Sequence, residues 1–274
     1  MNTVSSSIKR NPFLSFVVLT YVFSWWPMML YLFGIAGGVA AFGPFLAALV
    51  VLGLTEGKPG VKQLLGRMVR WRVRWQWYLL ALGLPPILNA LASYLAIRFG
   101  APAPSVELLA DWPNILLLYP LWLLLPGLGG AWEEPGWRGY ALHQLEMGRS
   151  RLWGLPTLWL ILVVWHLPLF LTGGADWIDA LNMVGGVILY NWLYHRSGNS
   201  VLLVMMIHAM NNAVSDYLFP MFTGDHRTEQ VLMKTLVWGI AALIVLIVDW
   251  RWWTRTDESI VAEPTPTLGP AAGA

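Results

Sequence analysis

Apolar residues run in long unbroken stretches along this chain, and polar residues gather in the shorter segments between them. Eight of the stretches approach the length of about 20 residues that a helix needs to cross a bilayer, so we predict eight transmembrane helices. They cover 13–33, 37–54, 76–97, 113–132, 152–172, 178–194, 199–217 and 231–250. We therefore expect an all-α, polytopic membrane protein whose functional site lies in the core of the bundle.

Composition supports this fold class. The 274 residues are 57% hydrophobic and 12% charged, they include 18 tryptophans, and their mean hydropathy is +0.57. A soluble domain carries roughly 25% charged residues, so a water-soluble globule is excluded. The high hydrophobicity also excludes a disordered chain. Because no cysteine is present, disulfides, thiolate catalysis and cysteine-bound metals are excluded as well.

The positions of the basic residues set the expected orientation. With both termini cytoplasmic, 14 of the 17 lysines and arginines fall on the cytoplasmic side. Omitting any one segment would reverse all later ones and destroy this bias, so the bias supports a count of eight. We expect a multi-pass protein of a bacterial cytoplasmic membrane, with the lipid bilayer as a partner and no nucleic-acid partner.

The same pattern divides the chain into regions. We expect a cytoplasmic N-terminus (1–12), an N-terminal transmembrane region (13–112), a core that carries the chemistry (113–217), an outer loop with the last helix (218–256) and a disordered tail (257–274). Within the second region, residues 60–74 mix apolar and basic positions. This pattern is typical of an interfacial helix on anionic lipid or of an ordinary loop that supplies orienting charge.

Polar residues at membrane depth carry the chemical information, because such residues usually face a cavity or one another. The first set, Glu133, Glu134, Pro135 and Arg138, lies at the end of the fourth segment. Adjacent helical residues point about 100° apart, so the two glutamates have different surroundings. Glu134 and Arg138 are four apart and can pair, which leaves Glu133 to accept a proton. Alternatively, the cluster only sets orientation and Pro135 starts a new helix.

Two histidines lie in later segments. His166 has apolar neighbours, where a lone histidine often only bonds a backbone carbonyl. His208 and Asn212 are four apart on one helix face, where imidazole and amide N–H groups can hold an oxyanion or join two helices. Both histidines, Asn212 and Glu133 lie on cytoplasmic halves or near the middle of their segments. We therefore expect them to converge on a cavity open to the cytosol.

Such a combination is typical of hydrolysis. A glutamate with one histidine deprotonates water, while the second histidine and the asparagine hold the tetrahedral oxyanion. Alternatively, Glu133, His166 and His208 bind a zinc ion that acidifies the water. The residue types are compatible with both mechanisms.

These motifs resemble a known family. Glu-Glu-x-x-x-Arg, then a motif ending in His, then His-x-x-x-Asn, on successive segments, look like the CPBP family of intramembrane proteases. This is the CAAX protease and bacteriocin-processing group, also called Abi, and it includes the CAAX prenyl endopeptidases. The resemblance spans roughly 113–217. One position departs from it, because the family usually has an aromatic residue four before the histidine of the second motif, and this chain has Leu162.

The resemblance implies a role for each motif residue. Glu133 would activate water with help from His166, His208 and Asn212 would form the oxyanion hole, and Glu134 with Arg138 would support the site. Because the family is described both as metalloproteases and as glutamate-dependent enzymes, the resemblance implies either mechanism.

We therefore expect a membrane endopeptidase, similar to CAAX prenyl endopeptidases, that acts on a peptide near the cytoplasmic face. One alternative is a non-catalytic bacteriocin self-immunity or scaffold protein. Another is a small transporter that uses Glu133, Arg138 and His166 as a relay, although the outer halves of these segments look almost wholly apolar. The sequence lacks His-Glu-x-x-His and Gly-x-Ser-x-Gly, which disfavours other types of intramembrane protease.

Overall fold

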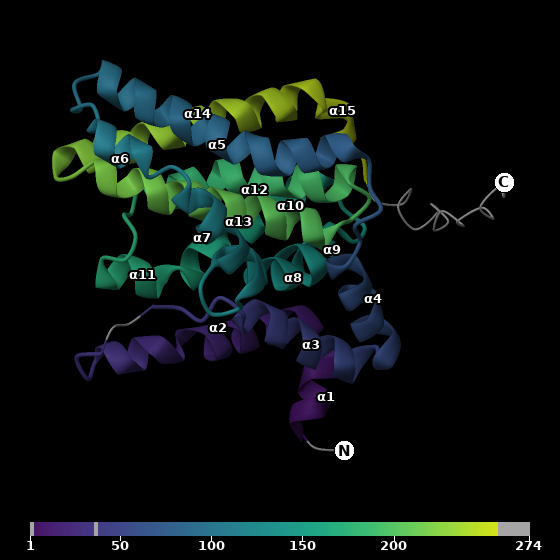
Figure 1. The fold of residues 1–274 in the computed structure, drawn as a ribbon. Coiled ribbons are helices and arrows are strands. Elements are labelled where there is room, and N and C mark those ends of the chain that lie inside the picture. Colours follow the sequence, from purple (N-terminus) through teal and green to yellow (C-terminus); the bar gives the residue numbers. More distant parts are fainter. Residues whose placement is uncertain (1–2, 36–37, 257–274) are drawn as a thin grey trace, which may run out of the picture.

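A computed structural model of the chain describes residues 3–35 and 38–256 (Figure 1). The tail predicted to be disordered, 257–274, lies outside the described residues. Within the described ranges the elements are helical, and the one β-type contact there is an isolated antiparallel bridge between Ser150 and Thr256. The all-α membrane fold class is confirmed.

The helices fall into three groups along the chain. The first group contains α1 (Thr3–Arg10), α2 (Pro12–Tyr31), α3 (Gly43–Thr55), α4 (Lys58–Met68), α5 (Trp75–Arg98), α6 (Val106–Ala110) and α7 (Asn114–Leu124). Short turns follow, namely η1 (Gly130–Glu133), α8 (Glu134–Gly136), the π-helical η2 (Trp137–Ala141) and α9 (Leu142–Glu146). The last group contains α10 (Arg151–Trp165), α11 (Leu167–Thr172), α12 (Asp179–Arg196), α13 (Val201–Leu218), η3 (Phe219–Met221), α14 (Asp225–Val248) and α15 (Trp250–Trp253).

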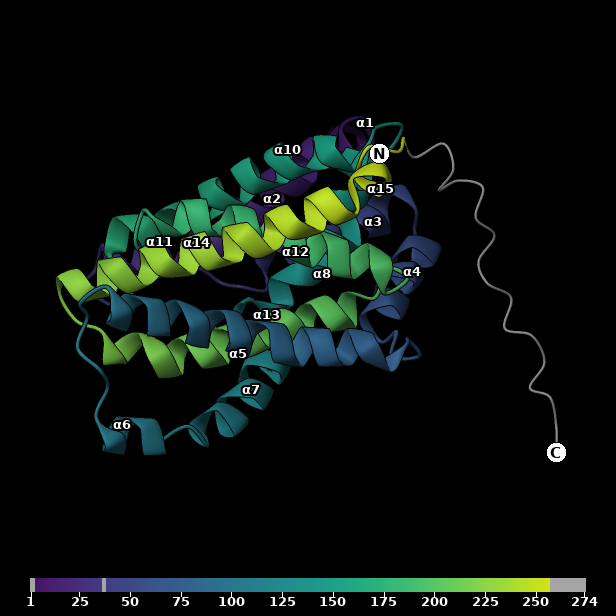
Figure 2. The same cartoon turned by 90° about the horizontal axis from the view of Figure 1, so that it is seen from above.

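The long helices form layers around the short turns (Figures 1 and 2). Helix α5 packs on α13 and α14, α12 packs on α14, and α2 packs on α3. One end of the bundle carries α4, α9 and α15, and the opposite end carries α6, α11 and the turn between α13 and α14. Helix α8 contacts both α3 and α13, so the residues of the glutamate motif lie inside the bundle.

Four helices are long and apolar enough to cross a membrane: α2, α5, α14 and the stretch Val201–Met221, which is α13 continued into η3. Helices α3, α7 and α10 are shorter apolar helices. Each predicted segment overlaps a helix, and the helix that overlaps the second segment, 37–54, begins at Gly43. The count of eight crossings stays a prediction. Outward apolar side chains, such as Val248 on α14 at 77% exposed, suit contact with lipid rather than water.

The fourth predicted segment, 113–132, is wrong as a single helix. Helix α7 ends at Leu124, and residues 125–129 are not helical. The reason is Pro126, which lacks an N–H group and keeps the preceding Leu125 out of the helical region, at φ −98° and ψ 111°. Non-helical backbone at membrane depth is tolerated where it lines a cavity.

The interfacial helix expected over 60–74 also differs from the structure. Helix α4 runs Lys58–Met68, and the residues after it are not helical. It is tied to the bundle, because Leu64 is buried and Nη1 of Arg67 donates to the carbonyl oxygen of Gly139 at 3.0 Å. Helix α4 therefore supports η2, while its contact with lipid stays a prediction.

Candidate active site

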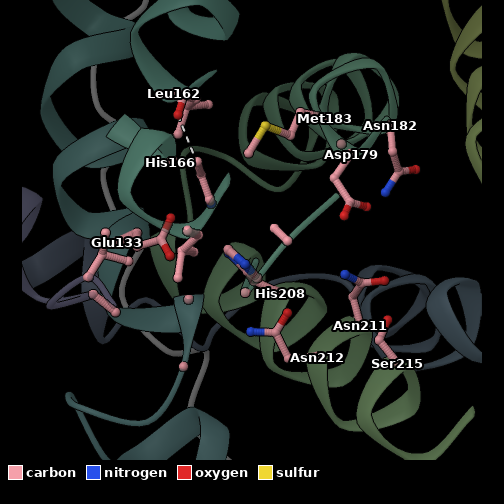
Figure 3. Close-up of a pocket in the computed structure, with 18 of the residues that line it drawn as sticks. Glu133, Leu162, His166, Asp179, Asn182, Met183, His208, Asn211, Asn212 and Ser215 are labelled. Atoms are coloured by element: carbon pink, nitrogen blue, oxygen red, sulfur yellow. Dashed lines mark hydrogen bonds between the residues drawn. The ribbon is translucent and has the colours of Figure 1, made fainter. Parts of the chain in front are cut away.

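A cavity of about 620 Å³ lies inside the bundle, and η1, α11, α12 and α13 contribute to its lining. Glu133, His166, His208 and Asn212 all line it. Figure 3 shows these side chains around one space. Glu133 comes from η1, His166 from the junction of α10 and α11, and the other two from α13. The structure therefore brings together the four residues that the sequence singles out for catalysis.

Glu133 is the last residue of η1 and is only 5% exposed. Trp137, one turn later, donates from Nε1 to its Oε2 at 3.3 Å. A Cβ atom placed on Gly130 would lie 2.9 Å from Oε1 of Glu133 and 2.1 Å from Nε2 of His208. The carboxylate and the imidazole therefore border the space that Gly130 leaves open, and a side chain at Gly130 would displace one of them.

His166 lies at the break between α10 and α11, inside the fifth predicted segment. Its Nδ1 is 2.8 Å from the carbonyl oxygen of Leu162, and because a carbonyl only accepts, Nδ1 carries the hydrogen. Nε2 is then an acceptor. The contact uses the backbone of Leu162, so the missing aromatic side chain at this position does not affect it. Trp165 packs edge-on against the imidazole, with 4.7 Å between ring centroids.

Glu134 is fully buried and joins two partners. Its Oε1 accepts a hydrogen bond from Nδ1 of His208 at 2.6 Å, and its Oε2 accepts one from Nη1 of Arg138 at 2.8 Å. The predicted pairing of Glu134 with Arg138 is confirmed. Nε of Arg138 also donates to Oδ1 of buried Asn191 at 2.9 Å. Sequence reasoning missed Asn191, although an asparagine within the apolar sixth segment was an available signal.

The local backbone explains how adjacent glutamates reach different partners. Pro135 lies in the first turn of α8, directly after η1, and the π-helical η2 follows. Such π-helical turns are rare and frequently occur at functional sites. A Cβ atom on Gly136 would lie 2.4 Å from the backbone carbon of Pro44 in α3. Glycine therefore allows the close approach of α8 to α3 that places Glu133 and Glu134.

Helix α13 presents His208 and Asn212 one turn apart on the side that faces the cavity (Figure 3). Asn211 lines the cavity too. Its Oδ1 accepts a hydrogen bond from Nδ2 of Asn89 at 3.1 Å, and Asn89 is buried in α5. Sequence reasoning missed both residues of this pair. The signal for Asn211 was a second asparagine directly beside the predicted one.

The cavity continues beyond these groups. Its lining includes Asp179 and Asn182 of α12, Ser215 of α13 and buried Lys234 of α14, whose Nζ donates to Oγ of Ser215 at 2.9 Å. These residues extend it toward the end of the bundle that carries α11 and the start of α14. The expectation that the outer halves are almost wholly apolar is therefore wrong. The expected opening to the cytosol would lie at the other end of the bundle, which carries α4, α9 and α15. The polar lining therefore extends away from that end.

The groups expected to share a zinc ion do not form a metal-type cluster. In the part of the chain that the structure describes, no three histidine, aspartate or glutamate residues are grouped so that they could hold a metal ion. Glu133, His166 and His208 all line the cavity, but they are not among any such group of metal-binding residues. We therefore derive the chemistry below from the protein's own groups.

Comparisons with known proteins indicate the class of protein that this chain resembles. Residues 113–214 match the family described as "Type II CAAX prenyl endopeptidase Rce1-like", and this range contains every residue assigned to the site above from Glu133 to Asn212. The chain is also 22% identical to CAAX prenyl protease 2 of Methanococcus maripaludis over 267 residues, which is 88% of this chain and 95% of that protein. These similarities confirm the resemblance to CPBP-family proteases and support intramembrane endopeptidase activity.

Proposed function

We propose that this protein is an intramembrane endopeptidase in which Glu133 and His166 activate water while His208 and Asn212 hold the oxyanion. The observation that carries this proposal is the meeting of a carboxylate, two imidazoles and an amide in one cavity. One hydrogen bond from Nδ1 fixes the orientation of each imidazole. Similarity to CAAX prenyl endopeptidases supports the same class of reaction.

Of the two adjacent glutamates, Glu133 is the better base. Both oxygens of Glu134 are engaged, one by His208 and one by Arg138. Among the described residues, Glu133 accepts one side-chain hydrogen bond, from the indole of Trp137 to Oε2, and its Oε1 borders the space beside Gly130. A general base needs a lone pair within hydrogen-bond reach of the proton that it abstracts. Of the two glutamates, Glu133 is the one with a free oxygen that borders the cavity.

Water activation then follows from two acceptors. Oε1 of Glu133 and Nε2 of His166 each accept a hydrogen bond, so a water molecule between them donates one hydrogen to each. Its oxygen directs a lone pair at the carbonyl carbon of the substrate. As the C–O bond forms, Glu133 takes the proton, and it returns this proton to the amine nitrogen as the C–N bond breaks.

The oxyanion forms on the opposite side of the carbonyl group. Glu134 holds Nδ1 of His208, so Nε2 of the same ring faces the cavity and, in the imidazolium form, donates an N–H there. Asn212 adds its amide N–H, one helical turn away. Donors that are already in place need no reorganisation when charge develops, which makes them effective.

The substrate class rests on similarity. The relative from Methanococcus maripaludis is named as a CAAX prenyl protease. We extend to this chain a substrate that carries a prenylated cysteine near its C-terminus, the modification that a C-a-a-X sequence directs. We also place the protein in a bacterial cytoplasmic membrane with both termini inside, on the distribution of its basic residues.

Cleavage of a synthetic CAAX peptide tests the proposal. Farnesylated and unmodified forms of one peptide are incubated with purified wild type, Glu133→Gln and Glu107→Gln, and products are identified by mass spectrometry. Glu107 is an exposed glutamate of α6 and serves as the matched control. Wild type and Glu107→Gln should cleave the farnesylated form, and Glu133→Gln should not. No cleavage by any of the three proteins would favour a non-catalytic binding protein, and equal cleavage by all three would show that Glu133 is not the base.

A further inference from the structure

A second hollow lies at the end of the bundle opposite to α11, where α14 ends. It has a volume of about 450 Å³. Its lining residues are Arg196, Ile247, Val248, Asp249, Trp250, Arg251, Trp252 and Arg255, which we call the arginine pocket. Within the described residues, none of these also lines the active-site cavity. The arginine pocket is therefore a separate site that the proposed reaction does not use.

One wall of the arginine pocket is held in place by stacked and paired groups. Two guanidinium groups lie over the ring of Trp252. The distance from its centroid to Cζ is 4.4 Å for Arg151 and 4.8 Å for Arg196. Arg196 also pairs with Asp249, with 2.6 Å between Nη2 and Oδ1. Trp192 donates its indole N–H to Asp249 as well. The only carboxylate among the lining residues is therefore already engaged, and this wall is preformed.

The other wall is cationic and open. Arg251 and Arg255 are both exposed, and neither side chain has a hydrogen bond or ion pair among the described residues. Within the part of the chain that the structure describes, two unpaired guanidinium groups therefore line a hollow whose carboxylate, Asp249, pairs with Arg196. Guanidinium is planar and binds phosphate oxygens through two parallel N–H groups, so the chemistry favours a phosphate ligand.

The arginine pocket also has an apolar part, which indicates that its ligand has an apolar group as well. Ile247 and Val248 end the candidate span α14 and are 65% and 77% exposed. Trp250 follows at 55% exposed, and tryptophans at such positions lie at the level of lipid headgroups. An occupant therefore meets cationic groups beyond the span and apolar groups along its last turn. A phospholipid has both parts in this order.

We propose that the arginine pocket binds an anionic phospholipid, with its phosphate on Arg251 and Arg255 and an acyl chain along Ile247 and Val248. The distribution of basic residues places this end of the bundle in the cytoplasm, where the leaflet is rich in anionic lipid. The site would anchor α15 to the membrane surface. This inference is independent of the proposed peptidase activity.

Lipid titration followed by native mass spectrometry tests the proposal. Phosphatidylglycerol and phosphatidylcholine with the same acyl chains are added to wild type, to Arg251→Gln/Arg255→Gln and to Arg98→Gln. Arg98 is an exposed arginine at the far end of α5 and is the matched control. Phosphatidylglycerol should bind wild type and Arg98→Gln equally, and its affinity should fall roughly tenfold or more in the double variant. Arg251→Lys/Arg255→Lys should retain part of the affinity.

Three results would overturn the proposal. One is equal phosphatidylglycerol affinity in the double glutamine variant and in Arg98→Gln. Another is phosphatidylcholine binding to wild type as tightly as phosphatidylglycerol. The third is inorganic phosphate that binds the pocket as tightly as the lipid, which would assign the site to a free anion. Because both mutated arginines are exposed, melting temperatures should match across the variants and confirm that folding is unchanged.

Discussion

Glu134 holds His208 through a hydrogen bond of 2.6 Å from Nδ1 of the imidazole to Oε1 of the carboxylate. This contact decides which edge of the ring faces the cavity, because Nε2 is left on the side of Gly130 and Glu133. It also occupies the oxygen that would otherwise make Glu134 a second base. One buried carboxylate thereby assigns different tasks to the two neighbouring glutamates.

Replacing this carboxylate should impair catalysis more than substrate binding. In Glu134→Gln, the amide keeps the shape but loses the charge that orients His208 and neutralises Arg138. We expect kcat to fall roughly 100-fold with little change in KM, since loss of a preorganised oxyanion group has this size of effect. Steady-state kinetics on the farnesylated peptide measure this, with Glu107→Gln as the control. An unchanged kcat would remove His208 from the oxyanion hole.

Asn212→Ala should lower activity without unfolding the protein. The side chain faces the cavity, and the structure gives it no hydrogen bond to another described residue, so its loss removes a donor to the oxyanion and little else. We expect kcat to fall by about 10²–10³. Thermal melting of the purified protein should give the wild-type temperature. A variant with full activity would contradict the assigned role.

The neighbouring Asn211→Ala should show the opposite pattern. Its Oδ1 accepts a hydrogen bond from Asn89, which is 1% exposed in α5, so the variant leaves a buried amide with one donor unpaired. We expect the free energy of unfolding to fall by about 1–3 kcal/mol. Denaturant titration in detergent measures this. If Asn211→Ala lowered kcat as much as Asn212→Ala at unchanged stability, the two roles would have to be exchanged.

Two glycines of the non-helical segment and η1 provide another matched pair. Gly130→Ala places a methyl group against Nε2 of His208 and Oε1 of Glu133, whereas Gly127→Ala places one where nothing lies within 4 Å. We expect Gly130→Ala to lower kcat roughly 100-fold, because a displacement of about 1 Å can have that effect. Gly127→Ala should stay near wild type. Similar rates for both variants would show that the gap beside Gly130 is not needed.

Orientation in the membrane can be measured directly, because the chain contains no cysteine. Arg72, between α4 and α5, and Thr223, between η3 and α14, are exposed and belong to opposite ends of the bundle, so single cysteines there mark the two ends. In intact cells, a membrane-impermeant maleimide should label Thr223→Cys at once and Arg72→Cys only after permeabilisation. The reverse labelling would place the polar end of the active-site cavity in the cytosol and refute the orientation derived from the basic residues.

Local spacing made part of the site predictable. Glu134 and Arg138 were expected to pair because they are four apart, and they do. His208 and Asn212 were expected on one face of a helix, and both line the cavity. Such predictions succeed because helical geometry fixes which side chains are neighbours within one element.

Contacts between distant elements were not predictable in the same way. Asn191 of α12 accepts a hydrogen bond from Arg138 of η2, 53 positions earlier, and no spacing along the chain reveals that. The break after Leu124 did have a local signal in Pro126, which the strength of the apolar run obscured. Lys234 lies near the start of the last predicted segment, but its partner Ser215 lies on another helix.

The central claim is that Glu133 performs the chemistry and contributes little to substrate binding. The most direct measurement is the cleavage rate and the peptide affinity of Glu133→Gln, determined on one preparation beside wild type, each before and after treatment with a chelator. The account predicts wild-type affinity with no detectable cleavage by the variant, and a wild-type rate that survives chelation. Cleavage by Glu133→Gln at a rate near that of wild type would contradict it.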